Sequence, residues 1–382
     1  MNKPSKNKVL NLGLLYSHSG VYNFGQQRYK DLVQYLNYTS FDDLDRSAMR
    51  SWIWQTCNEF GFFGTTDSGN SFFGSRISLN FYIDICMDVF GYNVEKIKAG
   101  IAKTLKVYGG MENYTGTNVI APRGSIDPWS ALALKASNDS SVIPYLIEEG
   151  SHCSDMSPPS ESDSESMKNL KALILQNIKK WIGVSPINNF VDARSSNNKQ
   201  KKLYGSQITW GKDSGFYKYK PSKKQLRRSF GRYLHKEILM KKFTENAAYM
   251  NITQNAISQP ADHFNKTDAK EWNQRFWNNS VFYKSDGPVF LMIDGEGPGG
   301  PSFINDENSP FLTWAKRFGA DTYFLEHRGY GESLPTSEQS METLKYISSE
   351  QALADIANFI EAINEIRPNS KWITFGGSYK YN

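Results

Sequence analysis

Cysteine is scarce in this chain of 382 residues, and long apolar runs are absent. Three cysteines cannot build a disulfide-rich scaffold. No apolar run approaches the roughly 20 residues that cross a bilayer, so we expect no membrane span. Histidines, cysteines and carboxylates do not occur at metal-ligand spacing, so we expect no metal and no cofactor. The apolar stretch near the N-terminus is short and is interrupted by Asn11, which predicts no reliable signal peptide.

An excess of charge of one sign is also absent, except in one stretch. The net charge is +5, and 39% of the residues are hydrophobic, which is typical of a globular chain. Lysine and arginine collect between Arg194 and Lys242. Such a stretch can bind nucleic acid or an anionic membrane. Because no nucleic-acid-binding motif accompanies it, we interpret residues 184–254 as a basic linker and expect no nucleic-acid partner.

Apolar periodicity predicts helices and strands on both sides of this linker. Helical spacing is present at Arg28–Leu36, Phe41–Ile53 and Ser166–Trp181, and again at Ser349–Ile366. Apolar runs predict strands near 281–285, 288–293, 320–326 and 371–375. Strands that alternate with helices indicate an α/β fold with a parallel sheet.

The strongest functional signal is a serine that follows one of these strands. The strand Lys371–Phe375 leads into Gly376-Gly377-Ser378, which is the layout of a nucleophile elbow. A serine nucleophile needs a base and an acid that orients the base. Asp127 and His152 each follow an apolar run upstream, in the order acid, histidine, serine. Local sequence alone equally allows a turn aspartate before Pro128 and a histidine on a surface loop.

Several segments resemble one family of serine exopeptidases, which includes lysosomal Pro-X carboxypeptidase, dipeptidyl peptidase II and thymus-specific serine peptidase. The segments in the first half are Trp52–Gly61, Gly124–Trp129 and Ser151–Met156. Those in the second half are Asp262–Phe264, Gln274–Trp277, Gly287–Leu291, Gly295–Pro298, Phe324–Ser333, Gln351–Asp355 and Gly376–Tyr379. The matches are collinear within each half, so together they are specific although each motif is short.

The resemblance implies an α/β-hydrolase type sheet with part of a helical lid, present as two incomplete halves. Residues 1–183 resemble the C-terminal half of one peptidase, with a lid remnant at 1–95 and the acid and histidine loops at 96–183. Residues 255–382 resemble the N-terminal half of a second peptidase, which ends at the nucleophile elbow. The basic linker at 184–254 lies between the two halves.

The resemblance also assigns roles to residues. Ser378 would be the nucleophile, His152 the base and Asp127 the acid that orients it. The Tyr379 N–H and the loop carrying Gly295 and Gly297 would supply the oxyanion donors. Trp129 would form a flat wall for a proline ring, the alternative being a buried core tryptophan. The implied activity is a serine-type exopeptidase, either a prolyl-type carboxypeptidase or a dipeptidyl peptidase, with a peptide as its partner; the oligomeric state stays open.

Further features bear on the compartment. The resemblance implies a disulfide between Cys57 and Cys86, whereas spacing alone also allows two free thiols. Sequons for N-glycosylation occur at Asn37, Asn113, Asn138, Asn251, Asn265 and Asn278. These features and the resemblance predict a secreted or lysosomal glycoprotein.

One expectation concerns whether the site assembles. In the family's sheet one central strand lies between the serine strand and the acid strand, and this chain lacks it. Closing that gap directly would displace Ser378 from His152 by one strand spacing, about 4.8 Å. We therefore expect that the two halves do not form an active site. The alternative function is a non-catalytic remnant that acts as a binding or scaffold protein.

Overall fold

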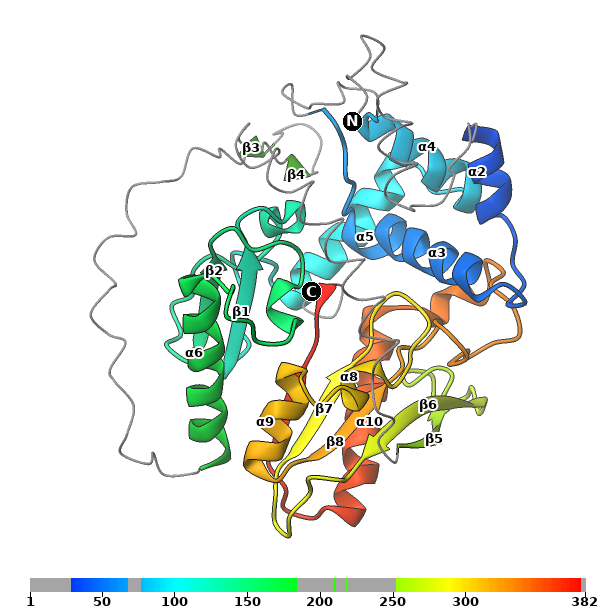
Figure 1. Ribbon diagram of the computed structural model, residues 1–382. Helices are drawn as coiled ribbons and strands as arrows, with labels where there is room; N and C mark the ends of the chain where they lie inside the picture. Colours follow the sequence, from blue (N-terminus) through cyan, green and yellow to red (C-terminus); the bar gives the residue numbers. More distant parts are fainter. Residues whose placement is uncertain (1–28, 68–76, 184–208, 211–216, 219–251, 379–382) are drawn as a thin grey trace, which may run out of the picture.

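The computed structural model describes residues 29–67, 77–183, 209–210, 217–218 and 252–378 (Figure 1). Its α-helices are α2 (Tyr29–Leu36), α3 (Leu44–Gln55), α4 (Leu79–Phe90), α5 (Val94–Tyr108), α6 (Glu165–Ile182), α8 (Ser302–Asn305), α9 (Pro310–Phe318) and α10 (Ser349–Ile366). Its strands are β1 (Val119–Gly124), β2 (Val142–Ile147), β3 (Thr209–Trp210), β4 (Tyr217–Lys218), β5 (Thr253–Pro260), β6 (Glu271–Asn279), β7 (Val289–Ile293), β8 (Asp321–Leu325) and β9 (Trp372–Phe375). Shorter helical turns lie at Thr56–Phe60, Pro128–Ala131, Ser154–Met156 and Leu344–Tyr346.

The main strands belong to two separate sheets (Figure 1). Five strands pair in the order β5-β6-β8-β7-β9, and β1 pairs with β2 alone. The pairs β7–β8, β7–β9 and β1–β2 are parallel. The expected parallel pairing does not extend to β5 and β6, which pair antiparallel with each other, as β6 does with β8. The chain turns back between β5 and β6 without a crossover helix, and such a connection gives antiparallel pairing.

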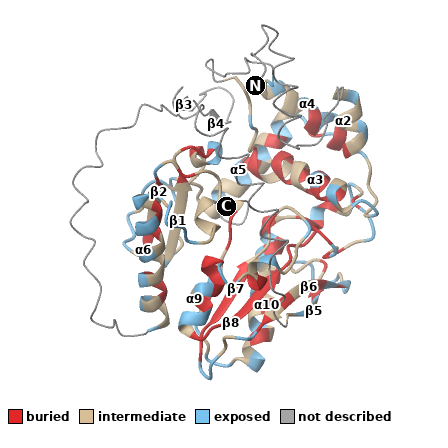
Figure 2. Cartoon of the chain, in the orientation of Figure 1, coloured by how far each residue is buried: buried red, intermediate tan, exposed pale blue. Residues whose placement is uncertain are grey.

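The core of the larger sheet lies around β7 and β8. All residues of β8 are buried, as are Val289 to Met292 of β7, which agrees with their continuous apolar sequence (Figure 2). Phe290 and Met292 pack toward α9, whereas Val289 and Leu291 pack toward α10. The strand expected near 281–285 is absent; that segment forms turns, one of them closed by the Tyr283 N–H on the Ser280 carbonyl.

The N-terminal helices form a second core that contacts the later part of the chain. Cys57 and Cys86, both fully buried, form a disulfide at the centre of this core. Leu344 and Ile347, from the segment before α10, belong to the same apolar cluster. Arg50 Nε of α3 donates to the Gln339 carbonyl at 3.1 Å. These apolar and polar contacts join residues that lie almost 300 positions apart in the sequence.

A buried carboxylate fixes the glycine-rich loop that follows β7. Glu326, at the end of β8, accepts two hydrogen bonds from Arg275, at 2.9 and 2.7 Å. It also accepts bonds from Ser333 Oγ at 2.6 Å and from the Gly299 N–H at 2.8 Å. A carboxylate that is 0% exposed is costly unless it is paired in this way. Glu326 therefore ties the loop at 294–301 to the end of the sheet.

Candidate active site

Ser378 stands at the carboxyl end of β9, on a turn that needs glycine beside it. The serine has a φ of 63°, a left-handed conformation that is strained for a residue with a side chain. A Cβ at Gly377 would lie 2.3 Å from Met156 Sδ and 3.2 Å from Cys153 Sγ. Only glycine lets the turn pass this close to the loop at 153–156. The local sequence therefore places the serine hydroxyl against the histidine loop.

Asp127 follows β1 and is held by its own helical turn. Its Oδ1 accepts the Trp129 N–H at 2.9 Å, which caps the turn Pro128–Ala131. The residue is only 6% exposed, so its carboxylate has little freedom to rotate. The second oxygen, Oδ2, is left to face the histidine loop.

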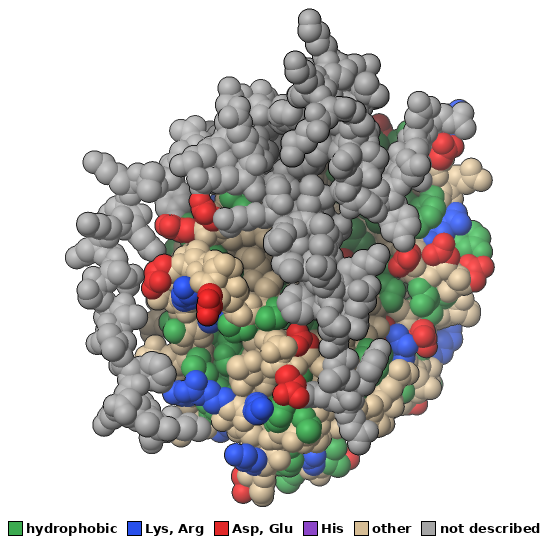
Figure 3. Space-filling view, viewed as in Figure 1, with side chains coloured by type: hydrophobic (Ala, Val, Ile, Leu, Met, Phe, Trp, Pro, Cys, Tyr) green, Lys and Arg blue, Asp and Glu red, His purple; other side chains and the backbone are tan. Residues whose placement is uncertain are grey.

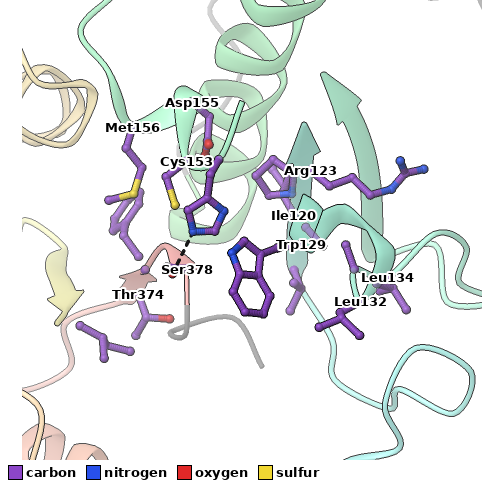
Figure 4. A pocket seen from close by; sticks show the side chains of 18 of the residues that line it. Ile120, Arg123, Trp129, Leu132, Leu134, Cys153, Asp155, Met156, Thr374 and Ser378 are labelled. Atoms are coloured by element: carbon purple, nitrogen blue, oxygen red, sulfur yellow. Dashed lines mark hydrogen bonds between the residues drawn. The ribbon is translucent and has the colours of Figure 1, made fainter. Parts of the chain in front are cut away.

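His152 follows β2 and lies between the other two side chains. Its Nδ1 lies 2.8 Å from Asp127 Oδ2, and its Nε2 lies 2.9 Å from Ser378 Oγ (dashed line in Figure 4). The loops after β1 and β2 approach closely because Gly124 has no side chain; a Cβ there would lie 2.2 Å from the Gly150 carbonyl oxygen. Acid, histidine and serine thus form one hydrogen-bonded chain, the arrangement of a nucleophilic triad.

The expectation that these three side chains stay apart is therefore wrong. It assumed that β9 and β1 would close directly against each other. Instead the two sheets stay separate, and the helices hold them in place. Ile178 of α6 packs in the same apolar cluster as Phe290 of β7 and Phe311 of α9. Because the gap is kept open, Ser378 is not displaced from His152.

The surroundings of His152 favour its protonated form. Burial alone would lower its pKa, but the hydrogen bond to Asp127 and the interactions with Cys153 outweigh burial and raise the pKa from 6.5 to about 10. A pKa this high favours the imidazole with both protons at neutral pH, and in that form its Nε2–H donates to Ser378 Oγ. A histidine must lose the Nε2 proton before it can accept one from serine.

Glu296 contacts the serine, although the sequence did not indicate it as a site residue. Ser378 Oγ donates to Glu296 Oε1 at 3.1 Å, so the serine hydroxyl lies between His152 and a carboxylate. Glu296 stands between the two glycines that the sequence suggested as oxyanion donors. Its acidic side chain inside a glycine-rich loop was the available signal, but a sequence does not show where a loop side chain points.

The predicted oxyanion donors have different outcomes. The Gly295 N–H donates to Asp294 Oδ1 at 2.8 Å, so it would have to leave this partner before it could bind an oxyanion. Gly297 has open space around its Cα, since an added Cβ would meet nothing within 4 Å. Tyr379 lies outside the described residues. The roles of Gly297 and Tyr379 stay predictions.

A large cavity opens beside the triad. Its volume is about 1250 Å³, and Asp127, His152, Ser378 and Glu296 all line it. Trp129 also lines it, is 38% exposed and is therefore not a buried core tryptophan (Figure 4). Its ring packs edge-on against Trp52 and Phe62, at centroid distances of 6.3 and 6.2 Å. These contacts fix the indole as a flat wall next to the imidazole.

The sequon asparagines differ in their accessibility. Asn37, Asn113, Asn138 and Asn265 are exposed, and Asn251 lies outside the described residues. Asn278 is different, because its amide donates to Asp321 Oδ1 at 3.1 Å and to the Thr322 carbonyl at 3.2 Å within the sheet. A glycan would have to replace one of the amide hydrogens that the fold uses, and glycosylation of Asn278 stays a prediction.

Acidic and basic side chains alternate over the visible described surface (Figure 3), while the basic stretch from Arg194 to Lys242 lies almost entirely outside the described residues. Across the described ranges, no three histidine, cysteine or acidic side chains are grouped to hold a metal ion. In the same part of the chain, no helix has the length and apolar character that a membrane crossing requires.

Comparison with known families decides the classification. The model of the serine carboxypeptidase S28 family matches residues 2–174 and 259–381, which is more than half of the chain. The chain belongs to this family. The S28 match includes the segments that carry Asp127, His152 and Ser378, and it leaves out the whole basic linker at 184–254.

Individual relatives match shorter segments. Thymus-specific serine protease of Mus musculus is 40% identical over 130 residues, which is 33% of this chain and 25% of the relative. The Homo sapiens thymus-specific serine protease is 36% identical over 134 residues, 35% of this chain and 26% of the relative. Lysosomal Pro-X carboxypeptidase of Homo sapiens is 36% identical over 131 residues, 32% of this chain and 26% of the relative. The chain thus spans about a quarter of the length of the curated relatives it matches.

Proposed function

We propose that this chain is a serine-type exopeptidase that cleaves peptides with proline near the scissile bond. The observation that carries the proposal is the hydrogen-bonded chain Asp127–His152–Ser378, with 2.8 and 2.9 Å between its members. Membership of the S28 family supports it, and so does the exposed wall of Trp129 beside the imidazole. A flat indole face suits the ring of a prolyl residue.

The proposed reaction is acyl transfer through a covalent intermediate. Ser378 Oγ attacks the scissile carbonyl carbon, and its proton passes to His152 Nε2. The carbonyl oxygen becomes an oxyanion, which the N–H groups of Gly297 and Tyr379 would stabilise. His152 then gives its proton to the leaving amine, and the peptide bond breaks. A water molecule, deprotonated by His152, hydrolyses the resulting ester and restores Ser378.

The hydrogen bonds of the resting site set one condition for this series of reaction steps. The serine hydroxyl donates to Glu296 and not to His152 while the imidazole is protonated. Loss of the Nε2 proton lets the hydroxyl rotate toward the imidazole. Glu296 therefore holds the serine in a state that does not attack, and deprotonation of His152 releases it.

We further propose that residues 1–183 and 255–382 derive from the C-terminal half of one S28 unit and the N-terminal half of a second. The order acid, histidine, serine supports this, as does the division of the family match at 174 and 259. A compartment outside the cytosol fits the disulfide Cys57–Cys86 and the exposed sequons.

A fluorophosphonate probe and prolyl peptides test the proposed activity together. We expect the probe to label Ser378 and to abolish hydrolysis of a fluorogenic Ala-Pro or Pro-Phe substrate. Labelling should vanish in Ser378→Ala and persist in Ser154→Ala, whose hydroxyl lies outside the triad. Absence of both labelling and turnover at pH 7–10 would favour the alternative of a non-catalytic binding protein.

A further inference from the structure

Glu59 lies on an irregular turn that borders the cavity. In the turn Thr56–Phe60 the Gly61 N–H donates to the Thr56 carbonyl at 2.8 Å, a spacing of five residues that is typical of a π-helical turn. Such turns are rare and are frequent at functional sites. Glu59 is intermediate in exposure and lines the cavity, and the proposed acyl transfer does not use it. Its carboxylate is therefore an acidic group of the cavity with no assigned role.

This carboxylate joins the turn to the start of α10. Glu59 Oε2 accepts from the Ser349 N–H and from Ser349 Oγ, both at 3.1 Å, and Oε1 accepts from the same N–H at 3.3 Å. Ser349 is the first residue of α10, where the N–H groups have no partner within the helix. The helix dipole stabilises a negative charge at this end. The ionised carboxylate therefore holds the turn against a helix that lies 290 positions further along the chain.

Two other contacts fix the part of the turn that precedes Glu59. Cys57 is linked to Cys86 of α4 by the disulfide. A Cβ at Gly100 of α5 would lie 1.9 Å from the Asn58 carbonyl oxygen, so α5 packs directly on the backbone of the turn. Because the turn is fixed up to Asn58, a change in the contact of Glu59 acts on the residues that follow it.

The residue that follows the carboxylate belongs to a cluster of four aromatic rings. Phe60 lies next to Trp52 and Phe62, at centroid distances of 6.4 and 5.1 Å. Each of these two rings also contacts Trp129, at 6.3 and 6.2 Å. The Trp129 ring in turn lies 6.4 Å from the ring of His152. We refer to the four rings of Trp52, Phe60, Phe62 and Trp129 as the aromatic wall.

Opposing effects act on the charge of Glu59. Burial raises its pKa from 4.5 to about 7, and the bonds from Ser349 offset burial only in part. Lys103 of α5 favours the ionised form and Glu350 of α10 disfavours it; both are exposed, and they lie 3.8 Å from each other. Tyr108 of α5 also faces Glu59, but burial raises the pKa of this phenol above its ordinary 10, so it stays neutral near pH 7. Glu59 therefore takes up its proton close to neutral pH.

The protonated carboxyl holds the turn less firmly than the carboxylate does. Hydrogen bonds to a charged acceptor are roughly twice as strong as those to a neutral one. A proton on Oε1 also turns this oxygen into a donor that faces the Ser349 N–H, which is itself a donor. The link between the turn and α10 is therefore strong above pH 7 and weak below it.

We propose that Glu59 is a positioning residue for the substrate: its carboxylate, while bound to Ser349, fixes the aromatic wall, and proton uptake loosens the wall. The role in substrate binding rests on the proposed peptidase function, whereas the movement of the wall does not. A fixed wall binds a peptide more tightly than a loose one, because fewer side chains must be ordered on binding. Glu59 thus makes the affinity for a prolyl peptide higher above pH 7 than below it.

Fluorine NMR of the full chain labelled with fluorotryptophan observes the wall without any substrate. Trp52→Phe assigns the resonance of Trp52, which contacts Phe60 directly. Trp277→Phe assigns an internal reference, since Trp277 is buried in the core of the larger sheet. Between about pH 5.5 and 8.5 we expect the Trp52 resonance to move with a midpoint near 7 and the Trp277 resonance to stay in place.

Three variants identify the group that titrates. In Glu59→Gln, which mimics the neutral carboxyl, the Trp52 resonance should keep its low-pH position throughout. Glu350→Gln is the matched control: the movement should persist with a lower midpoint, because Glu350 disfavours the charge on Glu59. Ser349→Ala removes one donor to the carboxylate, so the midpoint should rise by about 0.5 on the pH scale. This last variant decides the question if Glu59→Gln does not fold.

The effect on peptide affinity is measured with acetyl-Ala-Pro-amide, which has no group that titrates in this range. Its Kd is determined on the full chain carrying Ser378→Ala, so the result does not depend on hydrolysis. His152, with a pKa of about 10, stays protonated over the same range. We expect Kd to be at least threefold lower at pH 8.5 than at pH 5.5. Adding Glu59→Gln should give the higher Kd at both pH values.

Several outcomes would overturn the proposal. They are a Trp52 resonance that does not move, one that moves equally in Glu59→Gln, and one that stops moving in Glu350→Gln. A Kd that is the same at both pH values, or no binding at all, would overturn the role in substrate binding. The titration of Trp52 would still show whether Glu59 moves the wall, so failure of the proposed peptidase function is told apart from failure of this inference.

Discussion

Replacement of Asp127 by asparagine gives the sharpest test of the triad. Asp127 Oδ1 accepts the Trp129 N–H and Oδ2 accepts from His152 Nδ1. In Asp127→Asn the Trp129 N–H still needs an acceptor, so the amide oxygen must stay on that side. The amide NH₂ then faces His152 Nδ1 and donates to it. The imidazole keeps its remaining proton on Nε2, where it cannot accept the proton of Ser378.

The expected magnitude follows from that tautomer. A triad with the wrong histidine tautomer loses about 10⁴-fold in kcat, which corresponds to about 5 kcal/mol of transition-state stabilisation. The assay is kcat on a fluorogenic prolyl peptide, with circular dichroism to verify folding. Asp139→Asn, in an exposed turn, is the matched control and should keep full activity. If Asp127→Asn stays within tenfold of the unmodified chain, Asp127 does not orient His152.

Further predictions concern pH, stability and the serine. Cys153 helps to hold the pKa of His152 above its ordinary 6.5, so Cys153→Ser should lower the pKa of His152. The acidic limb of the kcat/KM–pH profile should then move to lower pH, and an unmoved limb would contradict this. Asp355→Ala leaves the fully buried guanidinium of Arg328 unpaired and should reduce the free energy of unfolding in urea by about 3–5 kcal/mol; a loss under 1 kcal/mol would refute the pairing. Glu296→Gln weakens a charge-assisted bond by about 1 kcal/mol, so fluorophosphonate labelling should become about fivefold faster, and slower labelling would show that Glu296 assists attack.

Much of the fold was predictable because several of its helices and strands are marked by local sequence patterns. The helix expected at Ser349–Ile366 has those bounds, since its apolar spacing and its Ser348 cap are both local. The strands β7 and β8 are within one residue of the expected ranges, because strands buried on both faces have continuous apolar sequence. Residues 281–285 have a similar apolar character but form turns, so the strand predicted there from composition is wrong.

The site was predictable in its members but not in its geometry. The strand-then-glycine pattern marked Ser378, and the apolar runs before Asp127 and His152 marked the other two. Their convergence depends on α6 packing against β7 and α9, through contacts such as that of Ile178. The end of α6 and the start of β7 are more than 100 residues apart, and no local sequence pattern encodes the contact between them. The bond from the Gly295 N–H to the neighbouring Asp294 carboxylate is local, but it depends on a side-chain conformation that the sequence does not show.

The bond between His152 and Ser378 spans 226 positions of the sequence and crosses the boundary between the two sheets. No strand pairing secures that boundary among the described residues, so the relative position of the two parts depends on side-chain packing and on single hydrogen bonds such as that from Arg50 Nε to the Gln339 carbonyl. The rate at which a probe labels Ser378 therefore reports whether the two sheets are held in their native relative position. A slight loosening that leaves every helix intact would already separate the two atoms, and probe labelling would decline at a lower denaturant concentration than the circular dichroism signal.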